Sequence, residues 1–340
     1  SGVLGVSLAG DGSLEKAVDG TVSGGLAVMA GVNTYTGETV VSGGTLQLGG
    51  NERLNKVSLV TVGGGTFDLG GYTQTLDRVV LSSGVLSNGS LTLNGSLELQ
   101  SGLVNAVVSG SGSLSKGTSG AVRVDALNSF TGAVTMEAGL LQLGTAGALG
   151  TGNTFRMDGG TLRLGGVEQV AAQVTLSSGL VEEGTLSGTG FTLNAGRVDA
   201  VLAGLGQVVK DSAGIVTLGN VNSYTGGTWV KAGTLVLAVD DALTSGGSLM
   251  VDGGSLALGV TRQTVGLFTL NGGELSGGSL AAAQYAFGSG TVGTVLGGSA
   301  ALVMTSEGTV TLVARGRRSS RARIWCVRAM WASRSRAMRH

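Results

Sequence analysis

One unit of 94–95 residues occurs three times in succession along this chain. The clearest block reads NTYTGETVVSGGTLQLG from Asn33, NSFTGAVTMEAGLLQLG from Asn128 and NSYTGGTWVKAGTLVLA from Asn222. Three other blocks return in the same order at the same offset, which excludes a chance match. In a repeat protein, each unit buries its apolar face only against its neighbours. The period therefore predicts an elongated array of stacked units.

Short segments of alternating apolar and polar residues, each ended by glycine, fill these units. Examples are TLQLGG, TFDLGG and SLTLNG, and the whole chain holds 65 glycines and no proline. Alternation with a period of two, ended by residues that tolerate a positive φ, is typical of short β-strands. No stretch within positions 1–312 sustains the apolar spacing of a helix. The sequence predicts an all-β fold.

The spacing of these segments favours a parallel β-helix, also called a β-solenoid. Apolar–x–apolar triplets suit a coil of three short strands with about 20 residues per turn, which gives roughly 15 coils. The lack of proline fits this fold, because every amide can then join a ladder between coils. A sandwich or an up-and-down barrel is the alternative, but neither requires such a long unit with ordered blocks. In the second unit, we expect strands at Leu141–Leu143, Phe155–Met157, Leu162–Leu164, Val174–Leu176, Phe191–Leu193 and Val208–Val209.

Residues 1–313 are expected to form one continuous β-helical domain, because neither the repeat blocks nor the glycine density lapses. Ser1–Gly37 is five residues longer than the matching spans Ser101–Gly132 and Ala195–Gly226, which predicts a loop near Asp19–Gly25. The alternation predicts that the inward ladder positions include Leu46, Leu48, Leu162, Leu164, Leu235 and Leu237.

Charge is distributed unevenly between the repeats and the end of the chain. Residues 1–312 hold 12 Lys and Arg against 21 Asp and Glu, a net charge of −9, whereas residues 313–340 hold nine Arg and no acid. The only cysteine and the only histidine, Cys326 and His340, also lie in this last segment. The repeats therefore cannot hold a disulfide scaffold or a Cys/His metal site, and their negative charge argues against nucleic acid as a partner. No apolar run reaches the roughly 18 residues that a membrane-spanning helix needs.

Residues 314–340 depart abruptly from the repeat. The next Asn-x-Tyr-Thr-Gly block is due at position 316, where GRRSS stands instead. Loss of glycine and of acidic residues at the point where a repeat is due indicates translation in a shifted reading frame. We therefore expect residues 314–340 to be a basic, disordered, non-repeat tail without a selected function. A basic, aromatic-bearing tail for nucleic acid or membrane is the alternative.

The Asn-[Ser/Thr]-[Tyr/Phe]-Thr-Gly block, with its later Gly-x-Leu-x-Leu, resembles the passenger-associated transport repeat of bacterial autotransporters. The copies from Asn33 and Asn222 match closely, whereas the copy from Asn128 has Phe130 in place of tyrosine and Leu140 in place of threonine. The resemblance implies a secreted passenger that folds as a right-handed parallel β-helix on the surface of a Gram-negative outer membrane. Because the chain opens within a repeat, we expect a longer protein whose C-terminal membrane barrel, a partner implied by the resemblance, lies outside this chain.

Within the motif, we expect the repeated residues to serve the fold. The aromatic residue fills one internal slot per unit, and the asparagine makes a corner turn through bonds between its side chain and the backbone. A recognition surface is the alternative, but aromatics four or five coils apart cannot form a contiguous stacking platform. The expected structural set is Asn33, Tyr35, Gly37, Asn128, Phe130, Gly132, Asn222, Tyr224 and Gly226.

Carboxylates that could act on a polysaccharide are the remaining candidates for chemistry, because glycoside hydrolysis needs two of them at a set separation. They are Glu182–Glu183, Asp240–Asp241 and Glu52. Adjacent acids on a strand are expected to point to opposite faces. The acids at positions 52 and 240–241 give way to Ala146–Gly147 in the middle unit, as in a variable solvated loop.

We therefore expect no enzyme and no catalytic, cofactor-binding or metal-binding residue. The leading hypothesis is a structural or adhesive passenger segment. It would be a rigid stalk that presents an interaction surface to ligands on a host or a neighbouring cell. A β-helical lyase or hydrolase that degrades polysaccharide is the alternative.

Overall fold

The fold is that of a computed structural model, which describes residues 1–17, 25–313 and 324–328. The chain forms two compact units, Ser1–Gly206 and Gln207–His340. Within the described ranges, every regular element of both units is a β-strand. The loop predicted near Asp19–Gly25 lies outside the described residues, except for Gly25 itself.

Short strands separated by tight glycine turns make up the first unit. In the part that the structure describes, they are β1 (Gly2–Leu4), β2 (Leu14–Lys16), β3 (Leu26–Met29), β4 (Thr39–Val41), β5 (Thr45–Leu48), β6 (Leu59–Asp68), β7 (Thr73–Leu99), β8 (Gly102–Ser109), β9 (Ser113–Lys116), β10 (Ala121–Val124), β11 (Val134–Met136), β12 (Leu140–Leu143), β13 (Thr154–Met157), β14 (Thr161–Arg163), β15 (Glu168–Leu176), β16 (Leu180–Glu182), β17 (Thr185–Leu193), β18 (Gly196–Val198) and β19 (Val201–Ala203).

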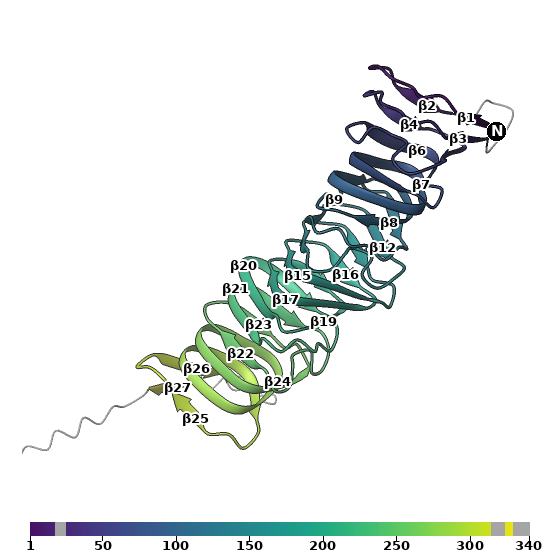
Figure 1. Cartoon of the computed structure of the whole chain (residues 1–340). Helices are drawn as coiled ribbons and strands as arrows, with labels where there is room; N and C mark the ends of the chain where they lie inside the picture. The colour runs from purple at the N-terminus through teal and green to yellow at the C-terminus, as the bar shows by residue number, and fades with distance from the viewer. Residues whose placement is uncertain (18–24, 314–323, 329–340) are drawn as a thin grey trace, which may run out of the picture. The chain divides into compact units, whose positions relative to one another are not determined.

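Strands β1 to β17 each pair in parallel with a strand one coil further along the chain, as the stacked turns of ribbon in Figure 1 show. Leu46 of β5 faces Phe67 of β6, and Leu186 of β17 faces Leu202 of β19. The first two residues are 21 positions apart in the sequence and the second two are 16 apart, against a predicted coil of about 20 residues. Parallel stacking of this kind is a β-solenoid, which confirms the predicted all-β parallel fold over the sandwich or the up-and-down barrel.

The core of the first unit consists of apolar ladders that run along the stack. Because successive side chains of a strand point to opposite faces, the alternating sequence puts one row inside. The predicted inward leucines of this unit are all at most 1% exposed. One ladder runs through Leu46, Phe67, Leu86, Val104, Val124 and Leu143, each facing the next.

The motif supplies a third side to its coil. In the middle copy, β9 and β10 form two sides, and residues 128–131 follow them as an extended segment. The amides of Ser129 and Thr131 donate to the carbonyls of Val108 and Gly110, each at 2.9 Å. This segment therefore bonds to the preceding coil as a strand would.

The second unit continues with the same kind of element. Its described strands are β20 (Gln207–Leu218), β21 (Thr228–Leu237), β22 (Ser248–Val251), β23 (Ser255–Ala257), β24 (Arg262–Gly297), β25 (Leu302–Met304), β26 (Thr309–Val313) and β27 (Ile324–Arg328).

Strands β20 to β26 of the second unit pair in parallel, coil on coil. Leu235 of β21 faces Leu256 of β23, which in turn faces Leu275 of β24, and all three are buried. Leu237 is 1% exposed, so the predicted inward pair of this unit is confirmed as well. Near the last coils, Phe268, Tyr285 and Phe287 pack edge to face, with ring centroids 5.7–6.4 Å apart.

The end of the described chain differs from the rest in its pairing. Strand β27 pairs antiparallel with β26, so that Thr311 faces Cys326. An unpaired edge offers free amides and carbonyls to any extended segment that can reach it. The sequence did not anticipate this strand within the tail 314–340, and the other residues of that tail lie outside the described ranges.

Within the residues that the structure describes, no helix is long and apolar enough to cross a bilayer.

Candidate functional site

The asparagine of the motif is buried, and its side chain bonds the coils on both sides. Asn128 is 4% exposed; its Oδ1 accepts from the amide of Val108 in the coil before at 2.7 Å, and its Nδ2 donates to the carbonyl of Ala148 in the coil after at 2.6 Å. Asn33 does the same with Leu8 and Arg53, at 2.8 and 2.9 Å. The asparagine therefore joins neighbouring coils in both copies, and Asn33 also makes a local contact, because its Nδ2 donates to the carbonyl of Gly31 at 2.9 Å.

The third copy keeps the bond to the following coil. Asn222 is 5% exposed, and its Nδ2 donates to the carbonyl of Ala242 at 2.8 Å. The side chain also bonds the carbonyl of Asn220 at 3.0 Å, which is a local contact of the kind expected for a corner.

The aromatic residue of the motif is buried in an internal slot, and its neighbour in that slot changes with it. The hydroxyls of Tyr35 and Thr39 are joined by a buried hydrogen bond of 2.6 Å, and those of Tyr224 and Thr228 by another of 2.6 Å. In the middle copy, Phe130 stands where tyrosine does, and the residue four positions later is Val134. Both are 1% exposed. The slot thus holds either a hydroxyl pair or an apolar pair.

Burial affects the acidity of both tyrosines. Desolvation raises the pKa of Tyr224 to about 12, and the bond to Thr228 opposes this shift only in part. Burial also raises the pKa of Tyr35. Both phenols therefore stay neutral at any physiological pH, and the slot offers no group for acid–base chemistry.

The glycines of the motif allow one coil to approach the coil before it. A Cβ on Gly37 would lie 2.3 Å from the carbonyl oxygen of Gly12, and a Cβ on Gly132 would lie 2.2 Å from that of Gly112. Real Cβ atoms do not come so close to an oxygen. Gly226 lies half-buried in the corresponding turn before β21.

A buried glutamine completes the motif two coils after each asparagine, and the sequence analysis did not find it. Gln169 is 3% exposed; its Oε1 accepts from the amide of Leu149 at 3.0 Å, and its Nε2 donates to the carbonyl of Gly150 at 2.6 Å. The amide of Leu149 belongs to the same peptide group as the carbonyl that Asn128 bonds. One peptide group is thus held by asparagine from one side and by glutamine from the other.

The same arrangement occurs in the other two copies. Gln74 accepts from the amide of Leu54 at 2.9 Å, and Gln263 accepts from that of Leu243 at 3.2 Å. The carbonyls of these two peptide groups accept from Asn33 and Asn222. A signal was present in the sequence, because Gln74, Gln169 and Gln263 recur at the period of the repeat.

A lysine lies inside the coil that precedes each motif. Lys116 and Lys210 are fully buried, and their ammonium groups donate to the carbonyls of Ala138 and Ala232, each at 3.2 Å. They also donate to the carbonyls of Thr118 and Ser212, two residues further along the chain. The half-buried Lys16 donates to Gly43 at 3.2 Å. Burial lowers the pKa of Lys116 and of Lys210.

The buried polar side chains therefore gather around the motif. We call the lysine, asparagine and glutamine of one copy a polar clamp; the three clamps are Lys16–Asn33–Gln74, Lys116–Asn128–Gln169 and Lys210–Asn222–Gln263. Between the clamps of the first unit, from residue 75 to 115, the buried side chains are apolar. Most bonds of the clamps go to backbone, so this arrangement holds coils together. Bonds to side chains also occur, such as those from Gln74 to Glu52 at 3.2 Å and from Gln263 to Thr261 at 3.1 Å.

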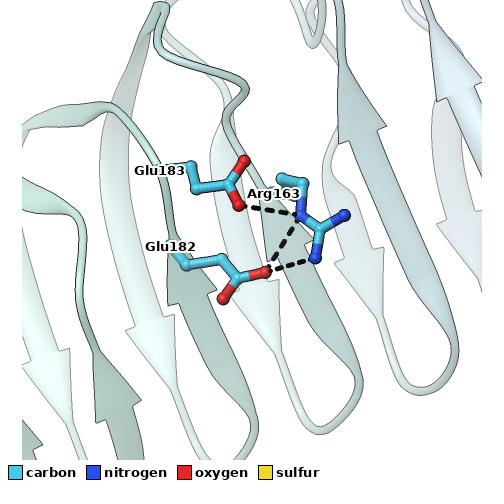
Figure 2. A network of polar contacts seen from close by, with 3 residues as sticks. All are labelled: Arg163, Glu182 and Glu183. Carbon is cyan, nitrogen blue, oxygen red and sulfur yellow. Dashed lines mark hydrogen bonds and ion pairs between the residues drawn. The ribbon is translucent and has the colours of Figure 1, made fainter.

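The acidic pair Glu182–Glu183 lies on the outer face of the first unit, beside a single arginine (Figure 2). Nη2 of Arg163 lies 2.9 Å from Oε1 of Glu182, and its Nε lies 3.4 Å from Oε1 of Glu183. The expectation that the two acids point to opposite faces is wrong. Strand β16 ends at Glu182, and Glu183 has a φ of 57°, so the left-handed turn brings both carboxylates to one guanidinium.

The other acidic candidates occupy turns and bond the coil that follows. Glu52 has a φ of 50°, and its carboxylate accepts from the amide of Thr75 at 3.0 Å and from its hydroxyl at 2.8 Å. Asp240 accepts from the amide of Arg262 at 2.8 Å, and Asp241 has a φ of 49°. Glu52 and Asp240 therefore each accept a hydrogen bond from the backbone of the following coil. In residues 1–17 and 25–313, no group of three or more His, Cys, Asp or Glu side chains could hold a metal ion.

The fold is a parallel β-solenoid, and its repeated motif lies inside and bonds neighbouring coils. The class of protein is therefore a repeat protein whose motif stabilises the stacking of its coils. The family model of the passenger-associated transport repeat matches residues 21–48 and 208–237, which contain the motif copies from Asn33 and Asn222. The middle copy, with its departures at Phe130 and Leu140, lies outside both ranges.

The chain is also similar to the adhesin BmaC autotransporter of Brucella suis biovar 1 (strain 1330). The two sequences are 29% identical over 315 residues, which is 84% of this chain and 9% of that relative. The chain thus spans about a tenth of the length of the curated relative. No solved structure matches it. The family match and the relative together confirm the predicted resemblance, which is that of an autotransporter passenger with repeats.

Proposed function

We propose that this chain is a stalk segment of a cell-surface autotransporter, a stack of coils that holds an interaction surface away from the outer membrane. The observation that carries the proposal is the inward use of the motif. Its asparagines and glycines serve contacts between coils and its aromatics fill the interior of their own coil, so what repeats along the chain is a device for stacking. The similarity to an autotransporter named an adhesin supports the same function.

We further propose that the three units are copies of one right-handed module with the period of the sequence repeat. Left-handed backbone at equivalent positions supports this: φ is 50° at Glu52, 69° at Gly147 and 49° at Asp241. The clamps support it as well, since each copy places a lysine, an asparagine and a glutamine at matching positions. Stalk length would then grow in steps of one module.

The chain acts without catalysis under this proposal. Arg163 pairs with both Glu182 and Glu183, and Glu52 and Asp240 bond backbone in turns. An enzyme of the polysaccharide-cleaving class would need two carboxylates free to act on a glycosidic bond. Under this proposal, the partners of the chain are ligands on a host surface or a neighbouring cell, and nucleic acid is not among them.

Adhesion and catalysis can be compared on the same purified chain. Beads coated with residues 1–340 are expected to attach to cultured epithelial cells or to bacteria of the producing strain more than beads coated with heat-unfolded chain. The chain is expected to release no reducing ends or unsaturated uronides from a panel of polysaccharides. Polysaccharide cleavage that disappears in Glu182→Gln or Glu52→Gln would replace the stalk proposal with the enzyme alternative.

A further inference from the structure

The apolar ladders of this fold leave one ambiguity in how coils stack. A coil displaced by one residue would turn its inward side chains outward, and burial forbids that. A coil displaced by two residues keeps an apolar side chain at nearly every inward position. Inward pairs such as Leu46 and Leu48 on Phe67 and Leu69 would remain apolar on apolar. Ladders of this kind therefore select strongly against odd displacements and weakly against even ones.

The polar clamps remove this ambiguity where they occur. Asn128 bonds an amide at position 108 and a carbonyl at position 148, and Gln169 bonds the amide of the same peptide group. Ala148 and Leu149 lie in a turn, where backbone groups do not recur in the same orientation every two residues as they do along a strand. If the coil shifted by two residues, the side-chain amides of Asn128 and Gln169 would therefore lose these partners. A buried polar group without a partner costs more than the hydrogen bond contributes, so the shifted stack is disfavoured.

The lysine adds a second constraint at the same corner. The ammonium group of Lys116 donates to the carbonyl of Ala138 and lies 2.7 Å from where a Cβ on Gly139 would be. Only glycine at that position leaves room for the lysine head. After a displacement by two residues, the buried charge would lose this carbonyl, and an unpaired buried charge is among the most costly features of a fold.

We propose that the three clamps are register locks: each fixes which residues face each other between adjacent coils, and the apolar stretches between clamps take their register from the nearest lock. This inference concerns the fold itself and stands whether or not the chain is an adhesive stalk. Buried polar groups fix register in the same way in other assemblies, because only one alignment gives them partners.

Glycine corners are the competing explanation for register. A Cβ on Gly84 would lie 2.2 Å from the carbonyl oxygen of Gly65, so that corner also limits how two coils approach. If the corners alone set the register, removal of the clamp would lower stability but would leave every coil in its native alignment. The two explanations therefore predict different alignments in the same variant.

Cysteine cross-linking distinguishes them. Ser115 of β9 and Thr135 of β11 face each other on the outer side of the middle clamp. Neighbouring strands lie about 4.8 Å apart, within disulfide range, whereas a pair offset by two residues lies about 8 Å apart, beyond it. In a Cys326→Ser background, S115C/T135C reports the native register, and S115C/A133C and S115C/E137C report displacement by two residues in either direction.

Each pair is oxidised in the full chain with an intact clamp, in N128A/Q169A, and in the control N105A/Q173A, which removes two exposed amides. We expect the displaced pairs to cross-link at least tenfold more in N128A/Q169A than in the other two chains. Q169L, which fills the same space without an amide, gives a second measurement should N128A/Q169A not fold, and an increase of at least threefold is expected there. Native cross-links alone in both clamp variants, or in Q169L when it is the one that folds, would overturn the proposal.

Discussion

The internal slot of the motif allows the energy of one buried hydrogen bond to be measured, because one copy has a Tyr–Thr pair where the middle copy has a Phe–Val pair. In the second unit, the hydroxyls of Tyr224 and Thr228 lie 2.6 Å apart, and the two residues are 0% and 3% exposed. Tyr224→Phe leaves the threonine hydroxyl without its partner, and Thr228→Val does the same to the phenol. A buried hydroxyl left in this state costs about 1–3 kcal/mol, so each single variant is expected to lose that much stability.

The double variant Y224F/T228V removes both hydroxyls at once and recreates the Phe130–Val134 pair of the middle copy. Replacement of both partners by apolar groups of the same shape is nearly neutral, so its expected loss is below about 1 kcal/mol. The two single losses together therefore exceed the loss of the double variant by at least about 1 kcal/mol, which corresponds to at least roughly fivefold in the unfolding equilibrium.

Urea unfolding followed by tryptophan fluorescence gives this cycle, because Trp229 directly follows Thr228. A background with Trp325→Phe and Trp331→Phe leaves Trp229 as the only reporter. F130Y/V134T in the middle copy is the reciprocal control and is expected to be tolerated better than F130Y alone. Additive losses in Y224F/T228V would refute the reasoning, because they would mean that the two hydroxyls do not depend on each other.

Four further outcomes are expected. Because burial raises the pKa of Tyr224 to about 12 from 10.0, the unfolded chain ionises at this residue first. The contribution of Tyr224 to stability is therefore full below pH 10 and is lost as the pH rises through about 12, by about 3 kcal/mol, so the difference between the wild-type chain and Tyr224→Phe in urea unfolding is expected to change by that amount over this range. Leu164→Ala, at 0% exposure, is expected to cost about 2–5 kcal/mol in thermal or urea unfolding, whereas Thr175→Ala on the outer face stays within about 0.5 kcal/mol; equal effects would mean that inside and outside are reversed. Gly132→Ala brings a Cβ to 2.2 Å from the Gly112 carbonyl oxygen and is expected to cost about 1–3 kcal/mol, against little change for Gly117→Ala, whose Cβ meets nothing closer than 3.6 Å. Translation of the gene in its other two frames beyond residue 312 is expected to restore an Asn-x-Tyr-Thr-Gly block near position 316, and its absence from both frames would end the frameshift hypothesis.

The parallel stack and its inward rows could be predicted because alternation of apolar and polar residues is a local property. All six strands expected in the second copy of the sequence repeat are present, and the leucines expected inside are buried. Such a pattern survives in the structure because burial of one face leaves the strand no other orientation.

The polar clamp could be predicted only in part. Asn128 was found through its motif, but Gln169 and Lys116 were not, since glutamine and lysine ordinarily lie on surfaces and each is buried here by partners in a neighbouring coil. The expectation that Glu182 and Glu183 point to opposite faces was wrong for a different reason. Strand alternation was applied across a residue whose backbone is left-handed, and sequence alone gives no sign of that at a glutamate.

The stretches without buried polar groups have a consequence for how a gene of this kind can lengthen. A recombination that inserts one more copy must join two coils that never met before. A junction inside a clamp would separate Asn128 from Gln169 and leave the peptide group between them with half of its bonds. A junction in an apolar stretch such as residues 75–115 asks only that leucine or valine meet leucine or valine. Junctions that join copies at unmatched positions are therefore expected to be tolerated better in the apolar coils than in the clamps, so the boundaries of such ancient duplications should be sought among the most featureless residues of the chain.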